Sequence, residues 1–73
     1  MGYVLVHYDR KRNVFVDDDW LGYTNVSMPT SNGLHDFTLG PGDAVTPASY
    51  TKTVKASHTL QHPLELTFTR TEP

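Results

Sequence analysis

Three consecutive aspartates at residues 17–19, directly before Trp20, are the first group in this chain whose types and spacing suggest chemistry. Carboxylate oxygens are the ligands that Ca²⁺ prefers, and an EF-hand loop also needs an oxygen at its fifth position and a glutamate at its twelfth. Here Leu21 and Met28 stand at those two positions. The spacing therefore favours a turn, in which Asp side chains bond nearby backbone amides and tolerate unusual φ values, over a calcium site.

The four histidines raise the possibility of a metal site or a hydrolytic site. His58 and His62 are four residues apart, which is about 13 Å along a strand, so they share an ion only if the chain turns between them. The chain has no Cys to supply a thiolate. It also lacks a Gly-x-Ser-x-Gly sequence, and the adjacent His35 and Asp36 should point to opposite faces of a strand. We expect no catalytic residue, no metal and no cofactor.

Aromatic residues are the better candidates for binding. Trp20 and Tyr23 lie close together in the sequence and next to the acids Asp18 and Asp19. Exposed aromatic side chains mark protein interfaces and sugar-stacking surfaces. We predict a binding site at these four residues. Two alternatives stay open: Trp20 folds back to cap a small core, or the four residues form a carbohydrate-binding site.

Length and charge narrow the class of protein. With 73 residues the chain is expected to be one domain, residues 1–73. A net charge of -2, with acids and bases mixed, argues against a nucleic-acid binder, and the basic run at 10–12 is interpreted as a solvated loop. No run of 18 apolar residues is present, so no membrane span is expected. No signal peptide is visible. The compartment stays open between the cytoplasm and excision from an exported or surface protein.

The elements expected to position these residues are strands. The predicted elements are a hairpin over residues 3–17 and strands over 34–39, 50–60 and 64–70. His35, Phe37 and Leu39 should share one face of their strand. No segment keeps a 3.6-residue apolar stripe for ten residues, so no substantial helix is expected. The pattern predicts an all-β fold, a small antiparallel β-sandwich of six to seven short strands.

A threonine pattern near the end of the chain suggests a further hypothesis. Thr51 and Thr53, and then Thr67, Thr69 and Thr71, would line the outer face of two adjacent strands. Regular threonine arrays of this kind are found on ice-binding surfaces. Threonine also simply favours strands, and cross-strand threonine pairs stabilise sheets. The second interpretation is preferred.

Several short motifs follow one another in an order that resembles a known family. Val-Phe-Val-Asp at 14–17 and Gly-Tyr-Thr-Asn at 22–25 are followed by Asn-Gly-Leu-His-Asp-Phe-Thr-Leu at 32–39 and Leu-Glu-Leu-Thr-Phe at 64–68. This order resembles the PEGA domain family over residues 14–69. The chain departs from the family pattern at Asn25, where Pro is usual, at Asp18, where Gly is usual, and in lacking the Pro-Glu-Gly-Ala string.

The resemblance implies a small β-sandwich of bacterial or archaeal type that serves as a non-catalytic accessory module. We therefore expect a protein-interaction or assembly module rather than an enzyme. Its partner would be another protein or a second copy, reached through edge strands, because a small sandwich leaves backbone groups there that another strand can pair with. The alternative is a carbohydrate-binding module that uses the exposed aromatics near Trp20 and Tyr23.

Overall fold

The chain is built from strands throughout the part that the structure describes. The computed structural model describes residues 1–42 and 44–71. These ranges contain no helix, which confirms the predicted all-β fold, and so none that is long and apolar enough to cross a membrane. Their nine strands are β1 (Gly2–His7), β2 (Asn13–Val16), β3 (Asp19–Tyr23), β4 (Ser27–Thr30), β5 (Gly33–Thr38), β6 (Val45–Thr46), β7 (Tyr50–Val54), β8 (Leu64–Thr67) and β9 (Thr69–Arg70).

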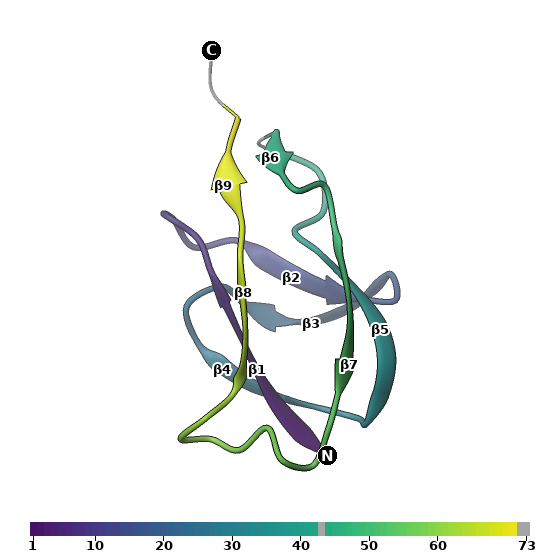
Figure 1. The fold of residues 1–73 in the computed structure, drawn as a ribbon. Helices are drawn as coiled ribbons and strands as arrows, with labels where there is room; N and C mark the ends of the chain where they lie inside the picture. Colours follow the sequence, from purple (N-terminus) through teal and green to yellow (C-terminus); the bar gives the residue numbers. More distant parts are fainter. Residues whose placement is uncertain (43, 72–73) are drawn as a thin grey trace.

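Two main sheets pack against each other, and a short two-stranded sheet of β6 and β9 lies beyond one end of them (Figure 1). The first sheet has the order β4-β1-β8 and the second the order β3-β2-β5-β7. All pairs in the second sheet are antiparallel. In the first sheet β1 is antiparallel to β4 but parallel to β8. The sandwich is thus present, but one of its sheets is mixed rather than purely antiparallel.

The predicted hairpin over residues 3–17 is wrong, because β1 and β2 lie in different sheets. Residues 8–12 cross from one sheet to the other. Val4 and Val6 of β1 and Val14 of β2 are all fully buried, so the two strands supply the core from opposite sides. Two apolar strands around a charged break fit both arrangements, since alternation tells which face of a strand is buried but not which strand lies beside it.

Alternate residues of the two sheets form one apolar core. Its buried members are Val4, Val6, Tyr8, Val14, Met28, Phe37, Leu39, Val54, Leu66 and Phe68. The strand predicted over residues 64–70 is divided at Phe68 into β8 and β9, but its alternation holds, because Leu66 and Phe68 are buried between exposed neighbours. The face predicted for residues 34–39 is confirmed as well: Phe37 and Leu39 are buried, and His35 beside them is half-buried.

The strand predicted over residues 50–60 ends early, at Val54. The chain then turns: the His58 N–H donates to the Lys55 carbonyl at 2.9 Å, and the Lys55 N–H donates to His58 Nδ1 at 3.0 Å. Leu60, the last residue of the predicted strand, is 56% exposed. The alternate apolar residues beyond Val54 therefore lie in a turn and do not mark the buried face of a strand.

The threonine array does not form. Thr51 and Thr53 lie on β7 in the second sheet, whereas Thr67 lies on β8 in the first. The two groups are on strands that do not pair with each other, so the flat surface that the ice-binding hypothesis requires is missing. The threonines here are explained by their preference for strands.

Candidate functional site

The acidic run forms the tight turn between β2 and β3. Asp17 and Asp18 both have positive φ values, 49° and 69°. Val16 pairs with Asp19 across the turn, which leaves two residues in the loop. Two consecutive left-handed residues define the type I′ turn, whose twist suits a hairpin. Asp tolerates this conformation better than most residues, so the prediction that these acids shape a turn is confirmed.

An irregularity in the next strand places two aromatic side chains on one face. Val14 pairs with Gly22 but Phe15 pairs with Trp20, so Leu21 is an extra residue in β3. In a regular strand, residues three apart point to opposite faces. The bulge shifts the alternation by one, and Trp20 and Tyr23 therefore both point outward. Their rings lie 5.6 Å apart, centroid to centroid, in an edge-to-face arrangement at 79°.

Polar neighbours hold these rings in place. Trp20 Nε1 donates to Asn13 Oδ1 at 3.1 Å, and Lys11 Nζ lies 4.3 Å from the centre of the Tyr23 ring, a cation–π contact. Trp20 is 56% exposed and Tyr23 is 41% exposed, so Trp20 does not cap the core. We call Lys11, Asn13, Trp20 and Tyr23 the aromatic shelf. Sequence reasoning missed Lys11 and Asn13, because their place beside the rings depends on the register of β2 against β3.

Asp18 and Asp19 are exposed at the turn end of the aromatic shelf. Lys11 lies at its other end, beside Tyr23. The outer face of the hairpin therefore has apolar rings at its centre, the exposed Asp18 at the turn end and Lys11 at the other end. Asp19 belongs to the opposite face, because it pairs with Val16, which packs against the core. The outer face can hold an aromatic or apolar group flat against a ring while charged groups orient it. All four predicted site residues thus lie on the same hairpin.

A second cluster, which sequence reasoning missed, joins Asp17, His35 and Ser31. Asp17 Oδ2 lies 2.5 Å from His35 Nδ1. His35 Nε2 lies 2.9 Å from the Ser31 carbonyl oxygen and 3.3 Å from Ser31 Oγ. The order of carboxylate, imidazole and hydroxyl resembles that of a hydrolytic triad. A general base, however, needs an unprotonated Nε2 that faces the hydroxyl. Here the nearer acceptor is the carbonyl, so both ring nitrogens face oxygen acceptors and the arrangement suits the imidazolium form.

The charges of this pair stabilise each other. The backbone N–H of Asp36, which donates to Asp17 Oδ1 at 3.0 Å, and then His35 lower the pKa of Asp17 below its ordinary 3.8. The hydrogen bond to Asp17 raises the pKa of His35 above its ordinary 6.5, although burial opposes this. As predicted, the Asp36 side chain points to the other face, where Thr51 Oγ1 donates to it at 2.5 Å. The cluster is therefore an ionic clamp across the second sheet.

The described residues offer no donor set for the metal hypothesis. Across residues 1–42 and 44–71, no three His, Asp or Glu side chains gather in a way that could hold a metal ion. The chain does turn between His58 and His62, but His58 Nδ1 accepts the Lys55 N–H. In the acidic run, Asp17 is taken up by His35.

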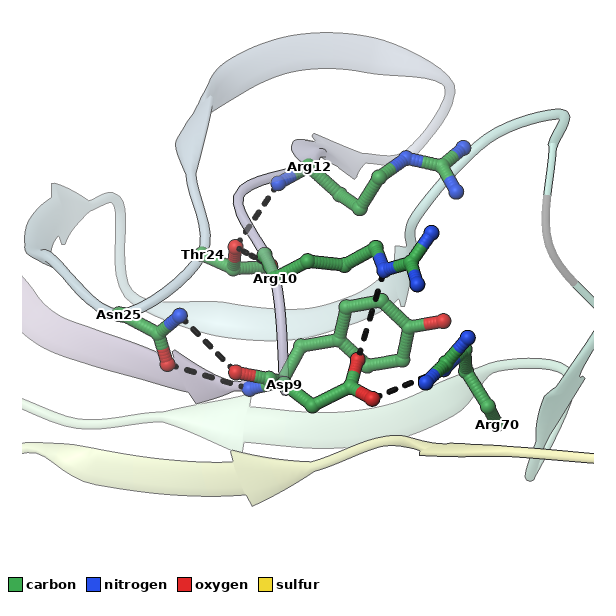
Figure 2. Close-up of polar contacts among 7 residues, drawn as sticks. Asp9, Arg10, Arg12, Thr24, Asn25 and Arg70 are labelled. Atoms are coloured by element: carbon green, nitrogen blue, oxygen red, sulfur yellow. Dashed lines mark hydrogen bonds and ion pairs between the residues drawn. The ribbon is translucent and has the colours of Figure 1, made fainter.

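Two side chains hold the loop between β1 and β2 by hydrogen bonding to its backbone N–H and carbonyl groups, as a neighbouring strand would. Asn25 Oδ1 accepts the Tyr8 N–H at 3.2 Å, and Asn25 Nδ2 donates to the Tyr8 carbonyl at 3.0 Å. The Thr24 hydroxyl donates to the Arg10 carbonyl at 2.8 Å and accepts the Arg12 N–H at 2.9 Å (Figure 2). Asn25 has a φ of 66°, which Asn adopts readily. Pro could not occupy this position, because its ring fixes φ at a negative value.

A cleft of about 320 Å³ opens next to this loop, where β1 and β8 end. Asp9 bridges its rim, because Asp9 Oδ2 lies 2.8 Å from Arg70 Nε and Asp9 Oδ1 lies 4.0 Å from Arg10 Nε (Figure 2). Its lining mixes polar and aromatic residues: His7, Tyr8, Asp9, Asn25, Thr67, Phe68, Thr69 and Arg70. No sequence motif indicated the cleft, because its residues come from three separate segments.

Comparisons with known proteins add no relative. No family model, curated protein or solved structure matches the chain. The resemblance to the PEGA family therefore stays a prediction that rests on the motifs alone, and the candidate sites rest on their geometry.

Proposed function

We propose that this chain is a non-catalytic protein-interaction or assembly module, a β-sandwich of the PEGA-like type, and that the aromatic shelf is its contact surface. The observation that carries this proposal is the exposure of Trp20 and Tyr23, 56% and 41%, on a hairpin that fixes both rings. Trp and Tyr are enriched among the residues that dominate protein–protein binding energy. Rings that are already fixed lose little conformational freedom when a partner binds.

Two features support binding over catalysis. In the carboxylate–imidazole–hydroxyl cluster, His35 Nε2 faces a carbonyl oxygen 2.9 Å away. This supports a stabilising role for His35 rather than proton abstraction. The aromatic shelf, in contrast, has charges at its ends and apolar rings at its centre, as protein interfaces do.

The angle between the two rings also favours a protein partner over a sugar. A flat platform, on which successive rings of an extended sugar chain could stack, would need nearly coplanar aromatic rings. Trp20 and Tyr23 are instead inclined at 79°, which leaves an L-shaped step. A step of this kind fits a protruding side chain better than a flat chain of sugars, which supports the protein partner.

The test is affinity capture with matched variants. Immobilised wild-type protein should retain a specific partner from extracts of the source cells, and W20A and Y23A should each lose at least about 90% of it. Leu60→Ala is the control, since Leu60 is as exposed as Trp20 but lies in the 55–63 connection. Equal retention by all four proteins would contradict the proposal. A sugar that binds the protein on a glycan array and also shifts the Trp20 fluorescence in solution would favour the carbohydrate-binding alternative over the protein-interaction proposal.

A further inference from the structure

Strand β3 is an edge strand, and it differs from the other edges of the two main sheets. In the order β3-β2-β5-β7, only β2 pairs with it. The edge strand β7 is tied to β8 by Tyr50, whose hydroxyl donates to the Thr67 carbonyl at 2.6 Å. The edge strand β4 carries Pro29, which has no N–H to offer a further strand. Among the described edges, β3 alone carries two exposed aromatic side chains.

The charges along β3 are polarised. Asp18 and Asp19 lie at its start, and Lys11 lies over Tyr23 at its end. Asp19 and Tyr23 are four residues apart, about 13 Å on a strand. A surface with one sign of charge at each end is complementary to a reversed copy of itself. No second protein is needed to supply the complementary charges.

A two-fold axis makes this match occur twice. In such an interface the same patch is used by both copies, so each contact is repeated. With the axis passing between Trp20 and Tyr23, the four aromatic rings of a pair lie at the centre. Asp18 of each copy then lies near Lys11 of the other, at the rim. An apolar centre with a charged rim is the usual organisation of a protein interface.

The bulge in β3 decides how the copies meet. The extra residue Leu21 interrupts the regular spacing of backbone groups along the strand. Bulges are one way in which proteins prevent continuous pairing at an edge. The contact therefore uses side chains rather than an unbroken backbone ladder, and it closes as a pair instead of growing into a fibre.

We propose that a second copy of this chain docks antiparallel against the β2–β3 hairpin. Trp20 and Tyr23 of the two copies meet at the centre, and Lys11 of each copy lies opposite Asp18 of the other. This proposal rests on the proposed function, in which the aromatic shelf is a contact surface, and it names the partner.

Sedimentation equilibrium of the full chain, from about 10 μM to about 1 mM in low salt, measures the pairing. The wild-type protein and Leu60→Ala should dimerise with the same Kd, and added salt should weaken the dimer. Trp20→Ala should raise Kd at least about 30-fold. Far-UV circular dichroism and thermal unfolding show that each variant is folded, so that a loss of pairing is not mistaken for unfolding.

A charge swap gives the sharper test. Lys11→Glu alone should raise Kd about tenfold or more, because it places like charges at both rims. Asp18→Lys should do the same for the opposite reason, and circular dichroism checks that the turn still folds with Lys at this left-handed position. An equimolar mixture of these two variants should recover dimers, since each rim then joins opposite charges.

Three outcomes would overturn this inference: a wild-type protein that stays monomeric at all concentrations, a dimer that ignores the Trp20 and charge variants, or a mixture that does not recover. The proposed function is tested separately by affinity capture. If the protein is monomeric but still captures a partner in a way that depends on Trp20, the second copy is ruled out as the partner and the aromatic shelf remains the contact surface.

Discussion

The side chains of Asp17 and His35 meet at 2.5 Å, although the two residues lie 18 positions apart in the chain. Asp17 also accepts the Asp36 N–H through its other oxygen, and its own N–H donates to the Asp36 carbonyl at 2.8 Å. One turn residue therefore fixes the end of the β2–β3 hairpin to β5. Because the aromatic shelf lies on that hairpin, the clamp helps to hold its orientation.

The clamp predicts a pH dependence of stability. His35 has a raised pKa in the folded protein, so its contribution is complete below its unfolded value of about 6.5 and is lost as pH rises through the folded value. Asp17 has a lowered pKa, so its contribution is present above about 3.8 and is lost as pH falls through the folded value. The pair should stabilise the fold most between about pH 4 and pH 6.5.

Urea unfolding at a series of pH values from about 4 to 9 measures this. The control is His35→Asn, which removes this imidazole and leaves the other three histidines in place. The urea midpoint of the wild-type protein should fall above about pH 6.5, and the variant should show a smaller fall. Curves of equal slope for the two proteins would show that the clamp does not set the pH dependence.

Asn25, in the connection between β3 and β4, is predicted to be the most sensitive polar residue beside the cleft. Asn25→Ala removes both hydrogen bonds to the backbone of Tyr8, which is buried, and places Ala at a φ of 66°. The expected loss is about 2–4 kcal/mol in the free energy of unfolding. Asn25→Gly keeps the backbone conformation and should lose about 1–3 kcal/mol. Chemical denaturation followed by circular dichroism separates the two effects. A loss below about 0.5 kcal/mol for Asn25→Ala would contradict this account.

Local features of this fold were predictable because they depend on neighbours in the sequence. The acids at 17–19 predicted a turn, and the alternation from Leu64 to Phe68 predicted a half-buried strand. The pairing of β1 with β8 was not predictable, since it joins segments some 60 residues apart and parallel pairs need a long crossover whose path alternation does not reveal.

The candidate site divides in the same way. Trp20 and Tyr23 were found because large aromatic residues next to acids are visible in the sequence. Their shared face depends on the bulge at Leu21. Gly22 lies beside it, but a Gly within a strand does not show which residue is the extra one, so the shared face was not predicted. The partnership of Asp17 with His35 requires the register of β2 against β5, so it appeared only with the fold.

The turn that begins the aromatic shelf should be improvable. Asp18 has a φ of 69° at the second loop position of a type I′ turn, where Gly is strongly preferred. Asp18→Gly should stabilise the protein by about 0.5–1 kcal/mol, because relief of the left-handed strain outweighs the entropy that Gly loses on folding. Asp19→Gly is the matched control, because Asp19 lies in β3 with ordinary extended pairing. It should destabilise the protein by about 0.5–1 kcal/mol. Thermal unfolding would contradict the assignment of the turn if both changes had the same sign.

Gly22 is predicted to set how closely β3 packs on β4. A Cβ at Gly22 would lie 2.5 Å from Met28 Sδ and 3.2 Å from Met28 Cγ. Gly22→Ala should therefore destabilise the protein by about 1–3 kcal/mol, although Met is flexible enough to move partly aside. Met28→Ala alone should cost about 2–5 kcal/mol through the cavity it leaves. The double variant should lose less than the sum, by about 1 kcal/mol or more, because the new methyl group enters the space that Met28 vacates. A double-mutant cycle from urea unfolding measures this coupling. If the two losses are simply additive, the backbone of β3 moves away from Met28 instead. The fluorescence of Trp20, which lies on the same strand, would then shift in Gly22→Ala and stay shifted in the double variant.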